Sequence, residues 1–345
     1  MTVKIDLPNT SYNIFIDKLQ NIKIDAKVVI VTNTTVSGLH IDYLKGFIEV
    51  KELSVVTLQD GEKYKNMDSL NEILEHCFEH KLNRSSVLIA FGGGVIGDMT
   101  GFAASIYQRG IDFIQVPTTL LSQVDASVGG KTGINNKYGK NLIGAFHQPR
   151  AVYIDPYFLS TLPKREFGAG VAEVIKMAVT FNSEFFTWLE NHRLDDENLN
   201  TAIAKSVETK AWVVSQDEKE KGLRAALNYG HTFGHVIENE TNYTTYLHGE
   251  AVGIGMVMAN NLAVKLGMME ESQANRIKAL LESYDIPTDY KIKNVESFYD
   301  KFFLDKKSLD DKIKFILPVG IGECSITDEI SKEDVIDVLK GFADE

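Results

Sequence analysis

Residues 1–155 alternate short β-branched runs with stretches of helical apolar spacing, and this alternation constrains the fold more than any other feature. Apolar side chains at helical intervals predict one helix over residues 67–81. We predict buried strands at residues 27–32, 53–58, 86–91, 113–116 and 151–154. Because strand–helix alternation is typical of a parallel sheet covered on both faces, we predict an α/β domain over residues 1–155.

The rest of the chain, residues 156–345, is predicted to be a mainly α-helical second domain. The strand pattern fades after Ile154, and long segments with helical apolar spacing follow. We expect these helices at about 164–191, 197–217, 228–240, 249–267 and 270–284. Two short runs, 314–317 and 323–326, predict a small β-ribbon before a C-terminal helix.

The composition excludes several classes of function. The formal net charge is −12 at pH 7, so general attraction to nucleic acid or to an anionic membrane is not expected. No apolar run approaches the ~20 residues of a membrane span, and the first residues show no signal-peptide core. Cys77 and Cys324 lie far apart in apolar surroundings and are expected to be free thiols. We therefore expect a cytoplasmic protein.

A glycine-rich turn follows the strand predicted at residues 86–91. The segment Gly92–Asp98 reads GGGVIGD and leads into a helical pattern. Glycines let the backbone turn sharply and let a pyrophosphate approach the free N–H groups of a helix N-terminus. Gly92, Gly94 and Gly97 match the dinucleotide fingerprint, although the match is weak by itself and lies unusually late in the chain. We predict a Rossmann-like, dinucleotide-binding domain, with a turn that needs glycine only for packing as the alternative.

Polar side chains follow two other predicted strands. The segment Asp60–Lys65 comes after the strand at 53–58, and Thr118 and Thr119 come after the strand at 113–116. Ligands of α/β proteins bind at the carboxyl ends of the strands, so these residues are candidates for the same site. Taken alone, a solvated capping turn explains Asp60–Lys65 better.

Three histidines gather within residues 231–248. His231 and His235 lie one helical turn apart on one face, and His248 begins the next predicted helix. Imidazoles and carboxylates without thiolates suit a catalytic Zn²⁺ or a similar divalent ion. Glu173 is the candidate carboxylate, because it interrupts an apolar helical face. The spacing suggests His231 and His235 as ligands. The alternatives are that one of them contacts substrate, or that both are hydrogen-bonded core histidines.

Several cations stand out against the acidic background. Each alone is more simply explained as an ordinary surface cation. Together with the glycine loops and the histidines, they predict a substrate that carries phosphate and carboxylate groups. The candidates are Arg109, Lys131, Lys140 beside Asn141, Lys176, Lys210 and Arg224.

At these residues the chain resembles the 3-dehydroquinate synthases, a family of sugar-phosphate cyclases. The resemblance extends over essentially the whole chain and is most specific in residues 92–98, 125–135, 223–235 and 247–252. It implies that Glu173, His231 and His248 bind Zn²⁺ or Co²⁺. His235 is then implied to contact the substrate instead of the metal.

The resemblance also implies which residues bind NAD and which bind substrate or act in catalysis. For NAD they are Asp60, Gly61, Glu62, Lys63, Tyr64, Lys65, Gly94, Val95, Ile96, Gly97, Asp98, Thr118, Thr119, Lys131, Lys140, Phe158, Leu159, Ser160 and Thr161. For substrate they are Asp125, Lys131, Asn141, Lys176, Lys210, Arg224, Asn228 and His235, with Lys306 or Lys307. Arg109 is implied to reach a neighbouring subunit's site, so a homodimer is expected. Relatives often carry an Asp and an Asn where this chain has Asn33 and Thr35, which leaves the ribose contacts open.

The implied reaction converts 3-deoxy-D-arabino-heptulosonate 7-phosphate to 3-dehydroquinate and phosphate, in the shikimate route to aromatic amino acids. Transient oxidation by NAD, phosphate elimination, re-reduction and intramolecular aldol closure make such an enzyme a lyase that regenerates its NAD. The nearest alternative is another cyclase, such as a 2-epi-5-epi-valiolone or 2-deoxy-scyllo-inosose synthase. A polyol dehydrogenase of the glycerol-dehydrogenase type is more distant. A nucleotide-binding regulatory module is the non-enzyme alternative, and it leaves the histidines unexplained.

Overall fold

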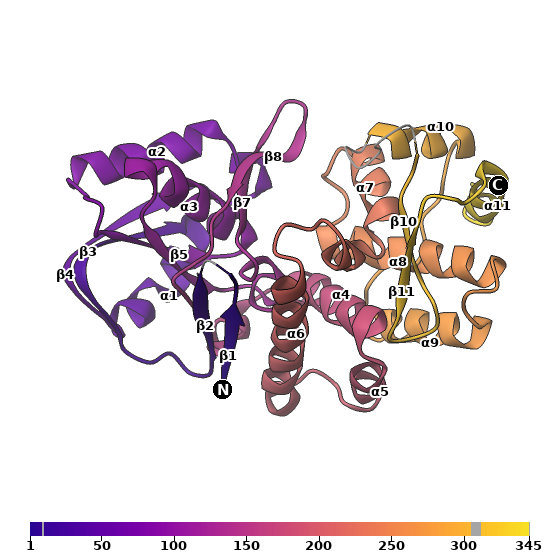
Figure 1. Cartoon of the computed structure of the whole chain (residues 1–345), viewed down its shortest axis with the longest axis horizontal. Helices are drawn as coiled ribbons and strands as arrows, with labels where there is room; N and C mark the ends of the chain where they lie inside the picture. The colour runs from indigo at the N-terminus through magenta and orange to yellow at the C-terminus, as the bar shows by residue number, and fades with distance from the viewer. Residues whose placement is uncertain (9, 305–311, 345) are drawn as a thin grey trace. The chain divides into compact units, whose positions relative to one another are not determined.

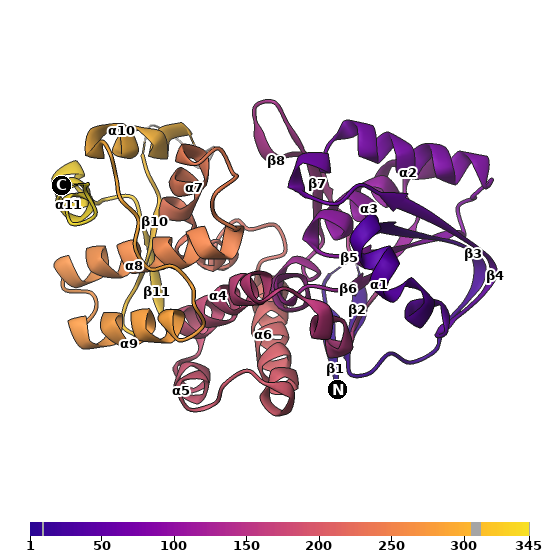
Figure 2. The ribbon, with the colours of Figure 1, turned by 180° about the vertical axis from the view of Figure 1, so that it is seen from behind.

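The computed structural model describes residues 1–8, 10–304 and 312–344. The chain divides into two compact units, shown from opposite sides in Figures 1 and 2. The first unit comprises Met1–Leu162 and Leu199–Lys219, and the second comprises Pro163–Asn198 and Glu220–Glu345. The change of unit at Leu162 lies near the domain boundary that we predict after residue 155, whereas residues 199–219 group with the first unit.

A seven-stranded sheet forms the centre of the first unit (Figure 1). Its strands are β1 (Thr2–Asp6), β2 (Ser11–Ile16), β3 (Ile22–Asn33), β4 (Ile48–Leu58), β5 (Val87–Gly92), β6 (Asp112–Pro117) and β9 (Ala151–Ile154). They lie in the order β1-β2-β9-β6-β5-β3-β4. β1 is antiparallel to β2, and the other neighbouring pairs are parallel. All five predicted strands are present, and the prediction of an α/β, Rossmann-like fold is confirmed.

Helices cover both faces of this sheet. They are α1 (Thr34–Lys45), α2 (Met67–Glu79) and α3 (Gly94–Ile106). Successive side chains of a strand point to opposite faces. Ile30 of β3 packs in the core that includes residues of α1, whereas Val31 packs in the core of α2 and α3. The helix that follows β3 and the helix that follows β5 therefore pack on opposite faces of the sheet. Because β3 and β5 are neighbours, the topological switch point of the sheet lies between them.

Short helical turns, a pair of strands and a long helix complete the first unit. The turns are η1 (Glu62–Tyr64), η2 (Tyr107–Arg109), η3 (Ser122–Ala126) and η4 (Pro156–Thr161), and the strands are β7 (Lys131–Asn136) and β8 (Gly139–Phe146). The helix is α6 (Asp196–Gln216), which belongs to this unit from Leu199 onward. β7 and β8 form an antiparallel hairpin that we did not predict from the sequence. A Cβ on Gly144 would lie 2.0 Å from the carbonyl oxygen of Thr132, so close approach of the two strands requires glycine there.

The second unit is mainly helical, as predicted. It contains α4 (Lys164–Phe181), α5 (Ser183–Asn191), η5 (Leu223–Asn228), α7 (His231–Glu240), α8 (His248–Lys265), α9 (Glu271–Glu282), α10 (Val295–Asp300), η6 (Lys301–Leu304), β10 (Phe315–Pro318), β11 (Cys324–Thr327) and α11 (Lys332–Lys340). β10 and β11 form the predicted antiparallel ribbon. Among the described residues, none of the helices combines the length and the apolar composition that crossing a membrane requires.

Glycines let three helices of the second unit pack backbone to backbone. A Cβ on Gly255 of α8 would lie 2.0 Å from the carbonyl oxygen of Gly230, which precedes α7. A Cβ on Gly249 of α8 would lie 2.0 Å from the carbonyl oxygen of Ala169 in α4. Because of these contacts, α8 packs closely against the start of α7 and against the first half of α4.

Candidate active site

The predicted dinucleotide turn lies at the switch point of the sheet, where β5 ends beside β3. A Cβ on Gly92 would lie 2.8 Å from Cβ of Ile96, and one on Gly97 would lie 2.7 Å from Oε1 of Gln115. A Cβ on Gly94, the first residue of α3, would meet nothing closer than 3.4 Å. Packing therefore explains Gly92 and Gly97 but not Gly94, which favours the dinucleotide interpretation of this turn.

Lys65 joins three segments that carry predicted NAD and substrate residues. Its Nζ donates to Oδ2 of Asp98 in α3 at 2.5 Å and to Oδ1 of Asn141 in β8 at 2.5 Å. Burial lowers the pKa of Lys65, but the charges of Asp98 and Glu62 outweigh it and raise the pKa above its ordinary value. Lys65 is therefore a protonated, buried lysine that holds η1, α3 and the β7–β8 hairpin together.

A second lysine links distant parts of the first unit. Lys210 of α6 donates from Nζ to the carbonyl oxygen of Asp125 in η3 and forms an ion pair with the Asp125 carboxylate. Both residues were predicted to contact substrate, although they are far apart in the sequence. Asn33 is one of the two positions where this chain differs from its relatives in the expected ribose contacts. Its Nδ2 donates to Oδ1 of Asp60, a predicted NAD residue, at 2.8 Å.

The other predicted site residues of the first unit follow the carboxyl ends of strands or lie in the hairpin. Thr118 and Thr119 come after β6, and the segment Phe158–Thr161 belongs to η4 after β9. Lys131 begins β7, and Lys140 lies in β8. The carboxyl ends of parallel strands share one edge of a sheet, so the strand-end residues lie on the edge where α/β proteins bind ligands.

Glu173, His231 and His248 lie together in the second unit. Each offers one ligand atom, and these atoms all lie within 4.8 Å of one another. Glu173 is fully buried, and its carboxylate forms an ion pair with Lys176. Its Oε2 is paired with Lys176, and among the described residues Oε1 accepts no hydrogen bond. Two imidazoles and a buried carboxylate with this free acceptor capacity fit a divalent metal ion such as Zn²⁺ or Co²⁺.

Helix packing brings these three residues together. Glu173 lies within α4, whereas His231 and His248 are the first residues of α7 and α8. Arg165 of α4 donates from Nε to Oε1 of Glu250 at 2.6 Å and from Nη2 to Oε2 at 2.6 Å. This bidentate pair anchors the first turn of α8 to α4, which keeps His248 beside Glu173.

His235 lies next to this group but does not belong to it. Its ring centroid is 5.5 Å from that of His231 and 6.3 Å from that of His248. The structure therefore groups His231 with a histidine from another helix, not with its neighbour one turn along α7. The residues of η5 lie just before this helix: Arg224 is buried, and Asn228 donates from Nδ2 to Oε1 of Glu220 at 2.6 Å.

Three carboxylates that hold candidate site residues or the helices carrying them were missed in the sequence. They are Glu220, which holds Asn228, Glu238, which contacts His248, and Glu250, which anchors α8. Glu250 does carry a local signal, because an acidic residue in the first turn of a helix accepts from free backbone N–H groups. The contacts of Glu220 and Glu238 depend on the packing of separate segments and leave no such signal.

Arg109 lies in an unusual turn of the first unit. Arg109 and the preceding Gln108 both have left-handed backbone conformations, with φ of 69° and 51°. The side chain of Arg109 is exposed. Left-handed conformations are uncommon for residues other than glycine and cost energy that the surrounding structure must supply. Lys306 and Lys307, one of which was predicted to contact substrate, lie outside the described residues.

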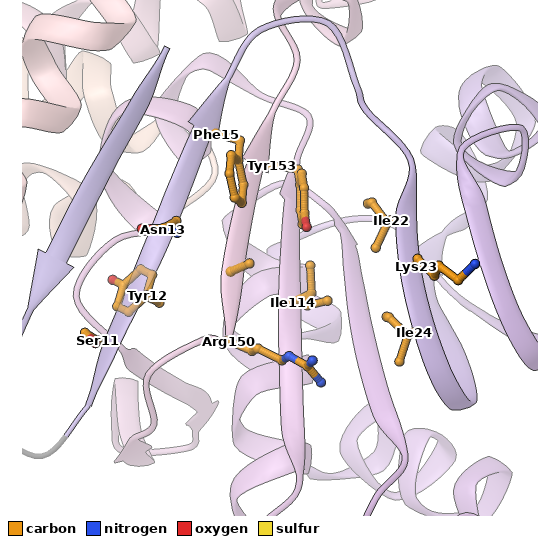
Figure 3. A pocket seen from close by; sticks show the side chains of 11 residues that line it. Ser11, Tyr12, Asn13, Phe15, Ile22, Lys23, Ile24, Ile114, Arg150 and Tyr153 are labelled. Carbon is orange, nitrogen blue, oxygen red and sulfur yellow. The ribbon is translucent and has the colours of Figure 1, made fainter.

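A separate pocket lies on the sheet face that α1 partly covers (Figure 3). Phe15 and Tyr153 stack at its upper end with ring centroids 4.9 Å apart. Ile22 at the start of β3 and Ile114 in the first half of β6 line it further along. Ile22 and Ile114 lie in the amino-terminal halves of their strands, whereas Phe15 and Tyr153 lie near the carboxyl ends of β2 and β9. None of the described residues that line this pocket is a predicted site residue.

Comparison with protein families shows two matches that together span most of the chain. Residues 55–169 match the 3-dehydroquinate synthase N-terminal family, and residues 170–308 match the 3-dehydroquinate synthase C-terminal family. A 3-dehydroquinate synthase of Sulfurimonas denitrificans is 63% identical over 346 residues, which cover 99% of each chain. One of Helicobacter hepaticus is 59% identical over 342 residues, which cover 98% of this chain and 97% of the relative.

Solved structures with similar folds are more distant in sequence. The 2-epi-5-epi-valiolone synthase of Streptomyces hygroscopicus, with NAD⁺ and Zn²⁺ bound, is 27% identical with a TM-score of 0.85, over 92% of this chain and 91% of that one. A 2-deoxy-scyllo-inosose synthase in complex with carbaglucose-6-phosphate, NAD⁺ and Co²⁺ is 25% identical with a TM-score of 0.85, over 99% of this chain and 100% of that one.

Proposed function

The chain belongs to the 3-dehydroquinate synthase family, and from this we infer that it converts 3-deoxy-D-arabino-heptulosonate 7-phosphate to 3-dehydroquinate and phosphate. The observation that carries this inference is identity of 63% over nearly the full length of a 3-dehydroquinate synthase. The two sugar-phosphate cyclase structures described above are 27% and 25% identical to this chain. The enzyme is a lyase of the shikimate pathway that uses NAD and a divalent metal ion.

We propose that Glu173, His231 and His248 hold the metal ion and that residues at the switch point hold NAD. When bound, the metal would supply Lewis-acid polarisation of substrate oxygens, and NAD would supply reversible hydride transfer. The NAD-binding set is the one implied by the resemblance, in η1, at the start of α3, after β6, in the hairpin and in η4. Two observations support this set. Packing does not explain why residue 94 is glycine, and most of these residues lie at the carboxyl ends of strands.

The substrate carries phosphate and carboxylate groups, and we propose that the cations and polar groups implied by the resemblance bind them. Lys210, positioned by Asp125, and Lys131 with Asn141 come from the first unit. Lys176, Arg224, Asn228 and His235 come from the second unit. Arg224 and Lys176 are almost fully buried, so their charges act in a low-dielectric environment where an anion is bound more strongly than in water. His235, beside the metal ligands, is proposed to exchange a proton with the substrate.

The experiment that tests this function supplies the purified protein with heptulosonate phosphate, NAD⁺ and Zn²⁺. We expect release of inorganic phosphate together with formation of 3-dehydroquinate, identified by mass spectrometry. Glucose 6-phosphate, an aldohexose phosphate that lacks the carboxylate, serves as the control substrate and is expected to give no phosphate. Absence of turnover with heptulosonate phosphate, or equal turnover with both compounds, would contradict the assignment.

We also propose a cytoplasmic homodimer in which Arg109 completes the site of the partner subunit. The exposed side chain and the left-handed backbone at Arg109 support this role. Mixing two inactive variants tests it. Arg109→Ala keeps its own metal ligands, and His231→Ala keeps its Arg109, so a mixed dimer contains one complete site. After dissociation and reassociation we expect roughly a quarter of wild-type activity, because half of randomly formed dimers are mixed.

The outcome separates action between subunits from action within one subunit. If Arg109 acts within its own subunit, each site of the mixed dimer lacks one group and the mixture stays inactive. Each variant incubated with itself through the same procedure is the control. A monomer by analytical ultracentrifugation at assay concentration would also rule out the proposal.

A further inference from the structure

Glu238 is a buried carboxylate that the proposed reaction does not use. It lies near the C-terminal end of α7, and its side chain is 3% exposed. Its Oε1 is 3.4 Å from Nδ1 of His248, the first residue of α8. The other ring nitrogen of His248, Nε2, is 3.8 Å from Oε1 of Glu173. The imidazole of His248 therefore lies between two carboxylates, one on each nitrogen.

This arrangement decides which nitrogen of His248 can bind a metal. A neutral imidazole carries its proton on one nitrogen and a lone pair on the other. A carboxylate beside Nδ1 favours the tautomer with the proton on Nδ1, because only an N–H can donate to it. The lone pair is then on Nε2, the nitrogen that faces Glu173.

His231 follows the same rule with a different acceptor. Its Nδ1 is 3.2 Å from the carbonyl oxygen of Tyr229. Both candidate histidine ligands thus have an acceptor beside Nδ1, which leaves Nε2 for a metal in each case. For His231 the acceptor is a backbone carbonyl oxygen, which a side-chain substitution does not remove. For His248 the acceptor is a side chain, so it can be removed by substitution.

The position of Glu238 in α7 is also consistent with this role. Glu238 is seven positions after His231, so the two side chains lie on the same face of α7, two turns apart. One helix therefore supplies a candidate ligand at its start and an acceptor for a ligand of α8 near its end. A buried carboxylate is costly unless it is paired or hydrogen-bonded, so its place beside His248 calls for a function.

We propose that Glu238 is a positioning residue that holds the His248 imidazole in the orientation and tautomer required for metal binding. This inference rests on the proposed metal site of Glu173, His231 and His248. Carboxylates that accept from the second nitrogen of a histidine ligand fix the ring and raise its basicity, and their loss typically weakens metal binding about 10- to 100-fold.

The test measures Zn²⁺ affinity, not activity. Glu238→Gln keeps the shape of the side chain and removes its charge, and we expect the Zn²⁺ Kd, from competition with a chromophoric chelator, to rise about 10- to 100-fold. The matched control is Glu240→Gln in the same helix. Glu240 accepts hydrogen bonds from Tyr290 at 2.8 Å and from Lys301 at 2.7 Å, not from a histidine. The Zn²⁺ Kd of the Glu240→Gln variant is therefore expected to stay within about twofold of wild type.

A second pair of measurements separates positioning from a general effect on folding. The thermal midpoint of the metal-free Glu238→Gln protein shows whether the variant folds like wild type. The visible spectrum of the Co²⁺-loaded protein reports the geometry around the metal, and we expect it to change in Glu238→Gln and to stay unchanged in Glu240→Gln.

The outcomes distinguish failure of this inference from failure of the proposed metal site. If wild type binds Zn²⁺, His231→Ala loses it, and Glu238→Gln keeps the wild-type Kd and Co²⁺ spectrum, only the role of Glu238 is refuted. A lower thermal midpoint with an unchanged Kd would refute it equally, because Glu238 would then act only in folding. If wild type binds no divalent metal, the metal site fails and the role of Glu238 fails with it.

Discussion

His231→Ala is expected to lose the bound metal and to lower turnover at least about a thousand-fold, because Lewis-acid stabilisation worth several kcal/mol disappears with the ion. The ligand atoms of Glu173, His231 and His248 lie within 4.8 Å of one another, so removal of one leaves two ligands from α4 and α8. Elemental analysis of the dialysed protein measures the metal, and phosphate release measures turnover.

His235→Ala is the matched comparison, because it removes the same type of side chain one turn further along α7. We expect it to keep the metal and lose turnover, since His235 lies outside the ligand group and is proposed to serve the substrate. Full metal retention in His231→Ala would remove that residue from the ligand set. Loss of metal in His235→Ala would instead restore the pairing that helical spacing suggests.

Gly255→Ala is expected to lower the free energy of unfolding by about 3 kcal/mol or more, an overpacking effect at the upper end of the usual range. The added Cβ would lie 2.0 Å from the carbonyl oxygen of Gly230 and 2.8 Å from the backbone nitrogen of Gly234. Both contacts are backbone atoms in or next to the first turn of α7, so they move only if the helix moves. Since His231 directly follows Gly230, we also expect weaker metal binding.

Gly38→Ala is the control for this prediction. Gly38 lies inside α1, and nothing lies within 4 Å of the position that its Cβ would occupy. Alanine in a helix interior is favoured over glycine by about 0.5–1 kcal/mol, so this variant should be slightly more stable than wild type. Chemical denaturation of both variants gives the comparison. Wild-type stability of Gly255→Ala would show that the α7–α8 contact is not as close as described.

The buried parallel strands were predictable because both of their faces are covered, so each strand contains a continuous run of apolar, mostly β-branched residues. The hairpins were harder. β1 and β2 alternate exposed and buried residues, as half-exposed strands do, and their period-two signal was overlooked. β7 and β8 are rich in Gly and Asn, which have low strand propensity, so their pairing depends on the partner strand and on the close approach at Gly144.

Local polar contacts explain one error in the helices. The apolar periodicity continues through residues 164–191, and a single helix was predicted there. Asn182 ends α4 and caps α5, since its side chain accepts from the backbone nitrogen of Phe185 at 2.9 Å. Asn is a favourable N-cap residue, so the break had a signal in the sequence that the apolar pattern masked.

The site itself was only partly accessible from spacing. Helical periodicity relates residues on one helix and therefore suggested His231 with His235. The group in the structure takes one residue from each of α4, α7 and α8, and its formation depends on glycine contacts between those helices. Only the resemblance to a family suggested that combination in advance. Glu238 was missed for the same reason, because its contact with His248 joins two helices.

If NAD is both oxidant and reductant within one turnover, one NAD molecule supports many turnovers, and the ratio of phosphate released to NAD supplied measures this. The protein is stripped of nucleotide and incubated with excess heptulosonate phosphate, Zn²⁺ and NAD⁺ at a concentration below that of the enzyme. We predict many phosphates released for each NAD molecule, with no accumulation of NADH absorbance. Phosphate release that stops when one NADH has formed for each NAD⁺ supplied would show that the enzyme consumes NAD⁺ and does not regenerate it.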